Sequence, residues 1–155
     1  MKITEVEIRA CSPGVVGDAV DDAQLRGGTA PEVVVISMKT DEGITGVSFG
    51  SGGLDSRWRG GITSSLKTAH VAEAFGMTCE LHTALYHPLE LANLHTSLAI
   101  SNTGWFELLY PVEDFSFGLA EPLDIRDGYA YAPTAPGLGA VYDWDAIDDA
   151  TVELE

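Results

Sequence analysis

Three side chains that can take up, release or hold a proton stand at the ends of short apolar runs: Asp55, His82 and Glu107. A histidine can act as a general base near neutral pH when a carboxylate fixes its tautomer and stabilises its cation. Asp55 is the expected partner of His82, and Glu107 could then stabilise negative charge that develops on a substrate oxygen. Because a histidine at a strand end is often purely structural, the pattern alone leaves both interpretations open.

The segments around these residues alternate between strand-like and helix-like patterns. Residues 77–82 and 104–109 are predicted as short strands, whereas apolar residues at helical spacing predict helices over residues 63–75 and 88–100. A β/α barrel positions its functional groups in this way, with groups contributed by the ends of several strands. This stretch therefore predicts the last part of such a barrel.

Three strand patterns precede this stretch, over residues 3–9, 32–39 and 44–49. The turn between the second and third contains Gly43, so a hairpin within a three-stranded antiparallel meander is expected, with the first strand at an edge. Residues 11–31 carry turn-forming residues throughout and are predicted as a long loop. Loops of this length in compact domains are usually functional or disordered.

The composition excludes several classes of function. The chain has 155 residues, and 24 acidic residues against 8 basic ones give a formal net charge of −16, so no basic patch can form for nucleic acid or an anionic membrane. No apolar run approaches the length of a membrane span, and the two cysteines form no metal-type pair, so a cytoplasmic protein is expected. Such acidity suits high salt, although an ordinary acidic cytosolic protein is the simpler interpretation.

Several further polar residues have competing interpretations. Arg57 and Arg59 could bind an anionic substrate, but ion pairs with acidic residues are an equal alternative. His70 and His95 lie among apolar helix positions and are expected to be packing or interface residues. A solvated face is expected for the aspartates near the C-terminus, whose spacing does not match a calcium-binding loop: Asp143, Asp145, Asp148 and Asp149.

Five motifs follow one another in a fixed order: Asp55-Ser-Arg-Trp-Arg-Gly-Gly-Ile-Thr63, Glu80-Leu-His82, Ala92-Asn-Leu-His95, Trp105-Phe-Glu107 and Pro136-Gly-Leu-Gly139. Together they resemble the C-terminal barrel segment of the enolase superfamily, in its mandelate racemase/muconate lactonizing enzyme branch. The N-terminal meander, including Asp41-Glu-Gly-Ile-Thr-Gly46, is similar to the start of the capping domain of that family. The resemblance covers nearly the whole chain.

The resemblance implies a reaction in which a proton alpha to a carboxylate is abstracted with the help of Mg²⁺. Racemases, cycloisomerases and dehydratases of sugar acids or hydroxyproline are the activities it suggests, each acting on a small carboxylate substrate. It further implies an Asp55–His82 dyad with His82 as general base or acid, and Glu107 as a hydrogen-bonding partner of the substrate carboxylate or enolate. The loop over residues 11–31 falls where the family's capping loop closes over the substrate.

The fold class that follows is α+β. Residues 1–50 are expected to form part of a capping domain with the antiparallel N-terminal meander, and residues 51–53 a glycine-rich junction. Residues 54–110 are expected to form the last, incomplete β/α units of a TIM-type (β/α)7β barrel. Residues 111–155 are expected to return to the capping domain.

The sequence departs from the family at its metal site. The three acidic ligands of Mg²⁺ and the Lys-x-Lys motif have no counterpart between Phe49 and Asp55. We therefore expect an internally truncated member that holds no Mg²⁺ and does not perform the parent reaction by itself. The alternative is a non-catalytic remnant or assembly module, which could form a homo-oligomer through open strand edges.

Overall fold

The computed structural model divides the chain into two compact units. One unit combines Met1–Ser56 with Trp144–Glu155, and the other consists of Arg57–Asp143. The residues that the structure describes fall into four stretches: 1–12, 33–51, 61–82 and 87–153. The first unit is thus built from both ends of the chain.

Some of the predicted features lie outside the described residues. They include most of the loop over residues 11–31 and most of the glycine-rich junction over residues 51–53. Three of the five candidate site residues are also outside: Asp55, Arg57 and Arg59. The domain boundaries drawn from the sequence stay a prediction.

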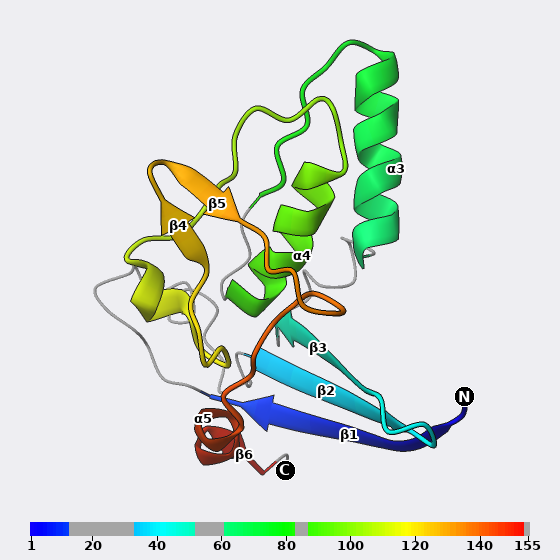
Figure 1. The fold of residues 1–155 in the computed structure, drawn as a ribbon, viewed down its shortest axis with the longest axis vertical. Helices are drawn as coiled ribbons and strands as arrows, with labels where there is room; N and C mark the ends of the chain where they lie inside the picture. The colour runs from blue at the N-terminus through cyan, green and yellow to red at the C-terminus, as the bar shows by residue number, and fades with distance from the viewer. Residues whose placement is uncertain (13–32, 52–60, 83–86, 154–155) are drawn as a thin grey trace. The chain divides into compact units, whose positions relative to one another are not determined.

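The first unit is built on a four-stranded sheet in which all paired strands are antiparallel (Figure 1). The strand order is β3-β2-β1-β6, with these bounds: β1 (Ile3–Cys11), β2 (Val33–Thr40), β3 (Thr45–Ser51) and β6 (Thr151–Val152). The turn between β2 and β3 places Gly43 at φ +77°, a left-handed conformation that glycine adopts without a Cβ clash. The predicted meander is confirmed, but β6 pairs with Ala10 and Cys11, so β1 is not an edge strand along its whole length.

The two faces of this sheet differ in burial because side chains alternate along each strand. One face holds the core of the unit, with these buried residues: Cys11, Val33, Val35 and Phe49. The opposite face carries Val6 and Ile8 on β1 and Met38 on β2, which are 55%, 61% and 39% exposed. Within the described residues, the sheet therefore buries one apolar face and leaves apolar side chains on the other.

A short helix near the C-terminus completes the core of the first unit. The helix α5 (Trp144–Asp149) places Ile147 at 0% exposure, in a segment for which the sequence predicts a solvated acidic face. A helix forms here because a single turn can bury Ile147 while the acidic residues stay in water. The exposed acidic residues are Asp145, Asp148 and Asp149.

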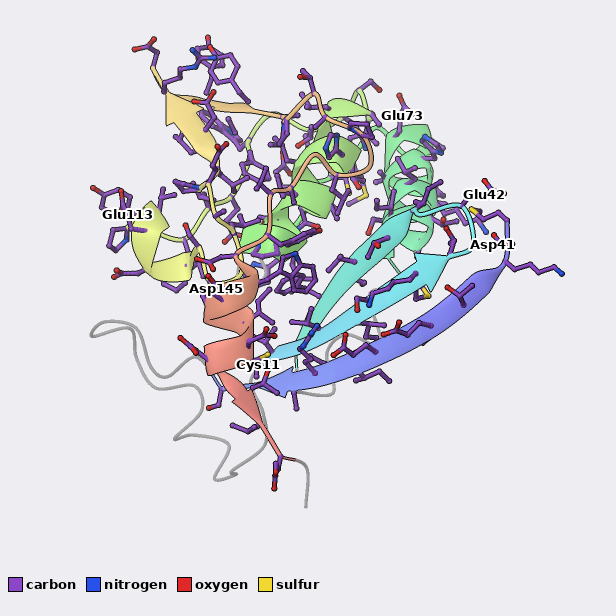
Figure 2. All side chains as sticks on the ribbon, turned by 60° about the horizontal axis from the view of Figure 1, so that its bottom comes forward. Cys11, Asp41, Glu42, Glu73, Glu113 and Asp145 are labelled. Carbon is purple, nitrogen blue, oxygen red and sulfur yellow. The ribbon has the colours of Figure 1, made fainter. Side chains whose placement is uncertain are left out.

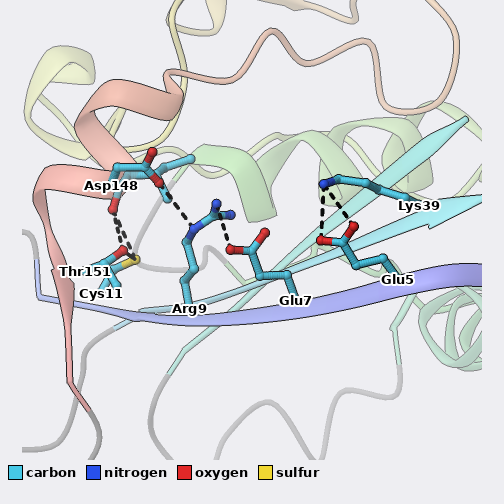
Figure 3. A network of polar contacts seen from close by, with 8 residues as sticks. Glu5, Glu7, Arg9, Cys11, Lys39, Asp148 and Thr151 are labelled. Carbon is cyan, nitrogen blue, oxygen red and sulfur yellow. Dashed lines mark hydrogen bonds and ion pairs between the residues drawn. The ribbon is translucent and has the colours of Figure 1, made fainter. Parts of the chain in front are cut away.

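Arg9 connects β1 to α5 (Figure 3). Its Nε lies 3.2 Å from Asp148 Oδ1, and its Nη2 lies 2.9 Å from Glu7 Oε1. The same guanidinium lies over the ring of Trp144, 5.4 Å from its centroid. The C-terminal segment is thus tied to the sheet by the Arg9–Asp148 ion pair and by a cation–π contact as well as by burial of Ile147.

In its described residues, the second unit contains two α-helices, a 3₁₀ helix and a β-hairpin. Their bounds are α3 (Gly61–Ala74), α4 (His87–Leu98), η1 (Val112–Phe115), β4 (Asp124–Arg126) and β5 (Tyr129–Tyr131). Both predicted helices are confirmed, and they contact each other (Figure 1). The hairpin turns through Asp127 and Gly128, both with positive φ, which matches the twist of the flanking strands.

The prediction of strands over residues 77–82 and 104–109 is wrong, because neither segment is assigned to a strand. The backbone amide of Cys79 donates to the carbonyl of Asn102 at 2.8 Å, but a ladder requires a series of such bonds. Strands inside a closed barrel are paired on both sides. These two segments therefore lie beside each other without the regular pairing that a barrel strand has.

We predict that Ile147→Ala lowers the free energy of unfolding of the first unit by about 2–4 kcal/mol, because it leaves a cavity at a fully buried site. Native-state amide exchange at β1 and β2 measures this loss for the unit itself. The matched control is Ile8→Ala, at a position that is 61% exposed, where a change below about 1 kcal/mol is expected. Equal losses for the two variants would contradict the assignment of Ile147 to the core.

Candidate active site

Two segments of the second unit run side by side in the same direction. Asn102 meets Met77 and Cys79, since its Nδ2 donates to the Met77 carbonyl at 3.0 Å and its own carbonyl accepts from the Cys79 amide at 2.8 Å. Two residues further on, the amide of Gly104 donates to Glu80 Oε1 at 3.3 Å. Because the later residues of one segment meet the later residues of the other, the two segments are parallel.

This alignment brings His82 and Glu107 together. The Nδ1 of His82 lies 2.8 Å from Glu107 Oε2, with the side chains 74% and 48% exposed. The structure thus brings together two of the predicted site residues, and it pairs the histidine directly with the residue predicted to bind the substrate. The predicted partner, Asp55, lies outside the described residues, so the Asp55–His82 dyad stays a prediction.

The pair has a definite chemical capacity. An ionised carboxylate can only accept a hydrogen bond, so the Nδ1 of His82 carries the proton that it donates to Glu107. In a neutral imidazole, the other nitrogen, Nε2, is then a proton acceptor. A carboxylate in this position orients the ring and stabilises its cation after the proton has been taken up. The arrangement can therefore accept and return a proton at Nε2.

Glu107 is positioned by its neighbours in the chain. Phe106 and Leu108 both pack against a hydrophobic cluster of Leu91, Leu119 and Leu123, whereas Glu107 between them is exposed. Leu91 is on α4, so the helix that links the two parallel segments also supports the second of them. The core of this unit therefore lies under the segment that carries the carboxylate.

Sequence analysis missed two polar residues of α4 that reach the site. The Nδ2 of Asn93 lies 3.3 Å from the His82 carbonyl and 3.1 Å from Glu90 Oε2. Glu90 is completely buried, at 0% exposure. A signal was present in the sequence, since a glutamate and an asparagine three residues apart on a helix share one face.

Two further histidines, His70 and His95, are on the helices α3 and α4. The Nε2 of His95 lies 3.1 Å from the carbonyl of Leu138, in agreement with its predicted packing role. His70 on α3 is exposed, so it does not pack in the core, and its role as an interface residue stays a prediction. A cavity of about 190 Å³ in the same unit is lined by residues such as Leu119, Pro122 and Tyr131, and by neither His82 nor Glu107.

The described residues do not fit a magnesium site. Across the four described stretches, no three His, Cys, Asp or Glu side chains converge as a metal cage would require. Among the acidic side chains labelled in Figure 2, Glu73 is on α3, Glu113 on η1 and Asp145 on α5, and Asp41 and Glu42 share the turn after β2. The expectation that this chain holds no Mg²⁺ stays a prediction.

Known proteins match the segment that carries this site. Residues 52–146 match the family described as "Enolase C-terminal domain-like", and the chain belongs to that family. A "D-galactonate dehydratase family member" of Enterocloster bolteae is 33% identical over 90 residues, covering 54% of this chain and 21% of the relative. The chain thus spans about a fifth of the length of that protein.

A solved structure from Pseudovibrio sp. agrees with this assignment. It belongs to a protein assigned to the mandelate racemase/muconate lactonizing enzymes, and it matches this chain with a TM-score of 0.58 and 35% identity. The match covers 61% of this chain and 25% of that chain. The family and branch predicted from the sequence are therefore confirmed. In the part of the chain that the structure describes, no helix has the length and apolar character to cross a membrane.

Tyr142 gives the second unit a predicted dependence on pH. Burial of Tyr142, which packs against the cluster under Glu107, raises the pKa of its phenol above the ordinary value near 10.0. The unfolded chain therefore ionises at lower pH than the folded one, so this contribution to stability is present below the ordinary pKa and is lost as the pH rises through the folded value.

We predict that phenolate absorbance during an alkaline titration shows a late step that disappears in Tyr142→Phe. The matched control is Tyr129→Phe, at a position that is 68% exposed, which should leave the late step in place. A late step that persists in Tyr142→Phe would show that this phenol is not the buried one.

Proposed function

We propose that this chain supplies the acid–base half of an enolase-superfamily active site. His82 would remove or return a proton alpha to the carboxylate of a small acid, acting through Nε2. Glu107 would orient the imidazole and stabilise its charged form. The observation that carries this proposal is the 2.8 Å contact between Nδ1 and Oε2 within the segment that matches the family.

The substrate class comes from the relatives. A carbon acid next to a carboxylate is weakly acidic, so its ionisation requires both a base and strong stabilisation of the enolate that forms. Mg²⁺ would provide that stabilisation in the parent reaction, which we propose to be a racemisation, cycloisomerisation or dehydration of an acid such as a sugar acid. The described residues provide the base without the metal cage. We therefore propose that the chain is an internally truncated member whose half-site needs a complementary part.

By itself, the chain should not exchange the alpha proton of any sugar acid with deuterated water above the rate without protein, even with Mg²⁺ present. The reason is that the base alone does not stabilise the enolate. Proton NMR of a panel of sugar acids measures the exchange. Exchange that is clearly above background and is abolished by His82→Ala would overturn the view that the chain is incomplete.

A chimera tests the roles of the residues directly. In the relative from Enterocloster bolteae, the 90-residue matching segment is replaced by the one from this chain, so that the rest of the site comes from the relative. The chimera should exchange the alpha proton of the relative's own substrate, and His82→Ala in the chimera should lower the rate by about 10²–10⁴-fold.

The matched control for the chimera is His70→Ala, a histidine on the exposed part of α3, which should leave the rate within about two-fold. A chimera that keeps its rate after His82→Ala would remove the histidine from the mechanism. Both outcomes require that circular dichroism shows the same fold for the variants.

The alternative function, an assembly module without activity, is favoured by exposed apolar side chains in the second unit. Phe75, Met77 and Trp105 are 77%, 62% and 82% exposed. Large apolar side chains on a soluble protein often mark an interface. A chain that self-associates in sedimentation experiments, together with an inactive chimera, would support this alternative.

A further inference from the structure

Residues 77–82 have no regular strand pairing, so other contacts must hold His82 in place. The imidazole is 74% exposed, so packing does little to fix it. Upstream, the amide of Cys79 donates to the carbonyl of Asn102, and Glu80 Oε1 accepts from the amide of Gly104. The backbone of His82 itself is bonded to α4, because its carbonyl accepts from the side-chain amide of Asn93.

The side-chain amide of Asn93 donates to two acceptors, a backbone carbonyl and a buried carboxylate. Its Nδ2 carries two hydrogens, which suits one bond to the His82 carbonyl at 3.3 Å and one to Glu90 Oε2 at 3.1 Å. Glu90 belongs to the first turn of α4 and is fully buried. A buried carboxylate is costly unless it is hydrogen-bonded, and acidic groups are favoured near a helix N-terminus. Asn93 is therefore held by a partner that is itself anchored in the core.

The helix that carries both residues is rigidly placed within its unit. Leu91 and Leu94 of α4 are each 2% exposed, and Leu91 belongs to the cluster against which Phe106 and Leu108 pack. One helix therefore supports both halves of the proton-transfer pair. It reaches Glu107 through apolar packing and His82 through Asn93.

We propose that Asn93, locked by the buried Glu90, is a positioning residue that keeps the His82 imidazole aligned with Glu107. The effect on the reaction rate rests on the proposed function, whereas the effect on the position of the imidazole does not. Without the amide, the His82 carbonyl loses its link to α4, and the exposed ring can leave the carboxylate. Misplacement of a catalytic group by about 1 Å lowers rates by about 100-fold.

The structural test uses the full chain labelled with ¹⁵N at histidine. Two-bond ¹H–¹⁵N correlation spectra report which ring nitrogen carries the proton, at mildly alkaline pH where a free imidazole is neutral. The signals of His82 are identified by their loss in His82→Ala. In the wild-type chain, Nδ1 should carry the proton, as required for donation to Glu107. In Asn93→Ala, the signals should shift to the mixture of tautomers seen for a free histidine.

A matched control removes a different hydrogen bond between α4 and a backbone carbonyl. His95→Ala breaks the contact to Leu138 and should leave the His82 signals unchanged. If Asn93→Ala does not fold, Asn93→Ser provides a second variant, because its shorter hydroxyl can donate one hydrogen only and cannot bridge both acceptors. An unaltered Nδ1-protonated tautomer in the folded Asn93 variant would overturn the proposal.

The catalytic test uses the chimera with the relative from Enterocloster bolteae. Asn93→Ala should lower the maximal rate of alpha-proton exchange by about 10- to 100-fold with little change in KM, because substrate binding does not use this residue. An inactive parent chimera, combined with the expected tautomer change in the chain, would contradict the proposed function and leave the positioning role supported. An active chimera with an unchanged maximal rate in Asn93→Ala would contradict the positioning role alone.

Discussion

The hydrogen bond between His82 and Glu107 depends on the alignment of two chain segments that form no sheet with each other. The two residues are 25 positions apart, and their contact exists because the segments are parallel over the residues before them. A parallel arrangement needs a connection that returns the chain to its starting edge, and α4 provides it. Every contact that holds this alignment therefore also holds His82 next to Glu107.

The links between the two segments use side chains in place of a backbone ladder. Asn102 bonds to Met77, and Glu80 bonds to Gly104, so each segment contributes one side chain to the backbone of the other. Such bonds are individually worth about 1 kcal/mol, and they lack the repetition that makes a sheet cooperative. The packing of Phe106 and Leu108 against the cluster around Leu91 therefore contributes more to the position of Glu107 than it would if the segments were strands of a complete barrel.

Much of the fold could be predicted because local patterns decide it. The hairpin at Gly43 and the end of α3 near Gly76 both require a residue with positive φ, and a glycine in the sequence predicts such a position. The helix over α4 is predicted as well, but the spacing of its apolar residues does not give its buried face, since Leu98 is 65% exposed and Glu90 is fully buried. Spacing finds a helix and only approximately its buried face, because the face is chosen by the elements that pack on it.

The site was only partly predictable for a similar reason. His82 and Glu107 stand out by residue type, but their direct contact depends on the register of two segments that carry no regular pairing. The spacing of Glu90 and Asn93 places them on one face of the helix, but only the burial of Glu90 shows that this face is turned inward. The sequence does not indicate the helix α5, because aspartates are typical of turns. The burial of Ile147 outweighs this turn preference.

The exposure of the pair limits what it can do in water. Charged groups near bulk water interact weakly, because the high dielectric constant and dissolved ions screen them. With the imidazole 74% exposed, Glu107 can orient the ring but can stabilise its cation only modestly. Efficient proton abstraction from carbon requires an environment from which water is excluded. The geometry of the pair is thus compatible with proton transfer, but its exposure to water is not. Efficient catalysis would require a surface that covers His82 without displacing it from Glu107.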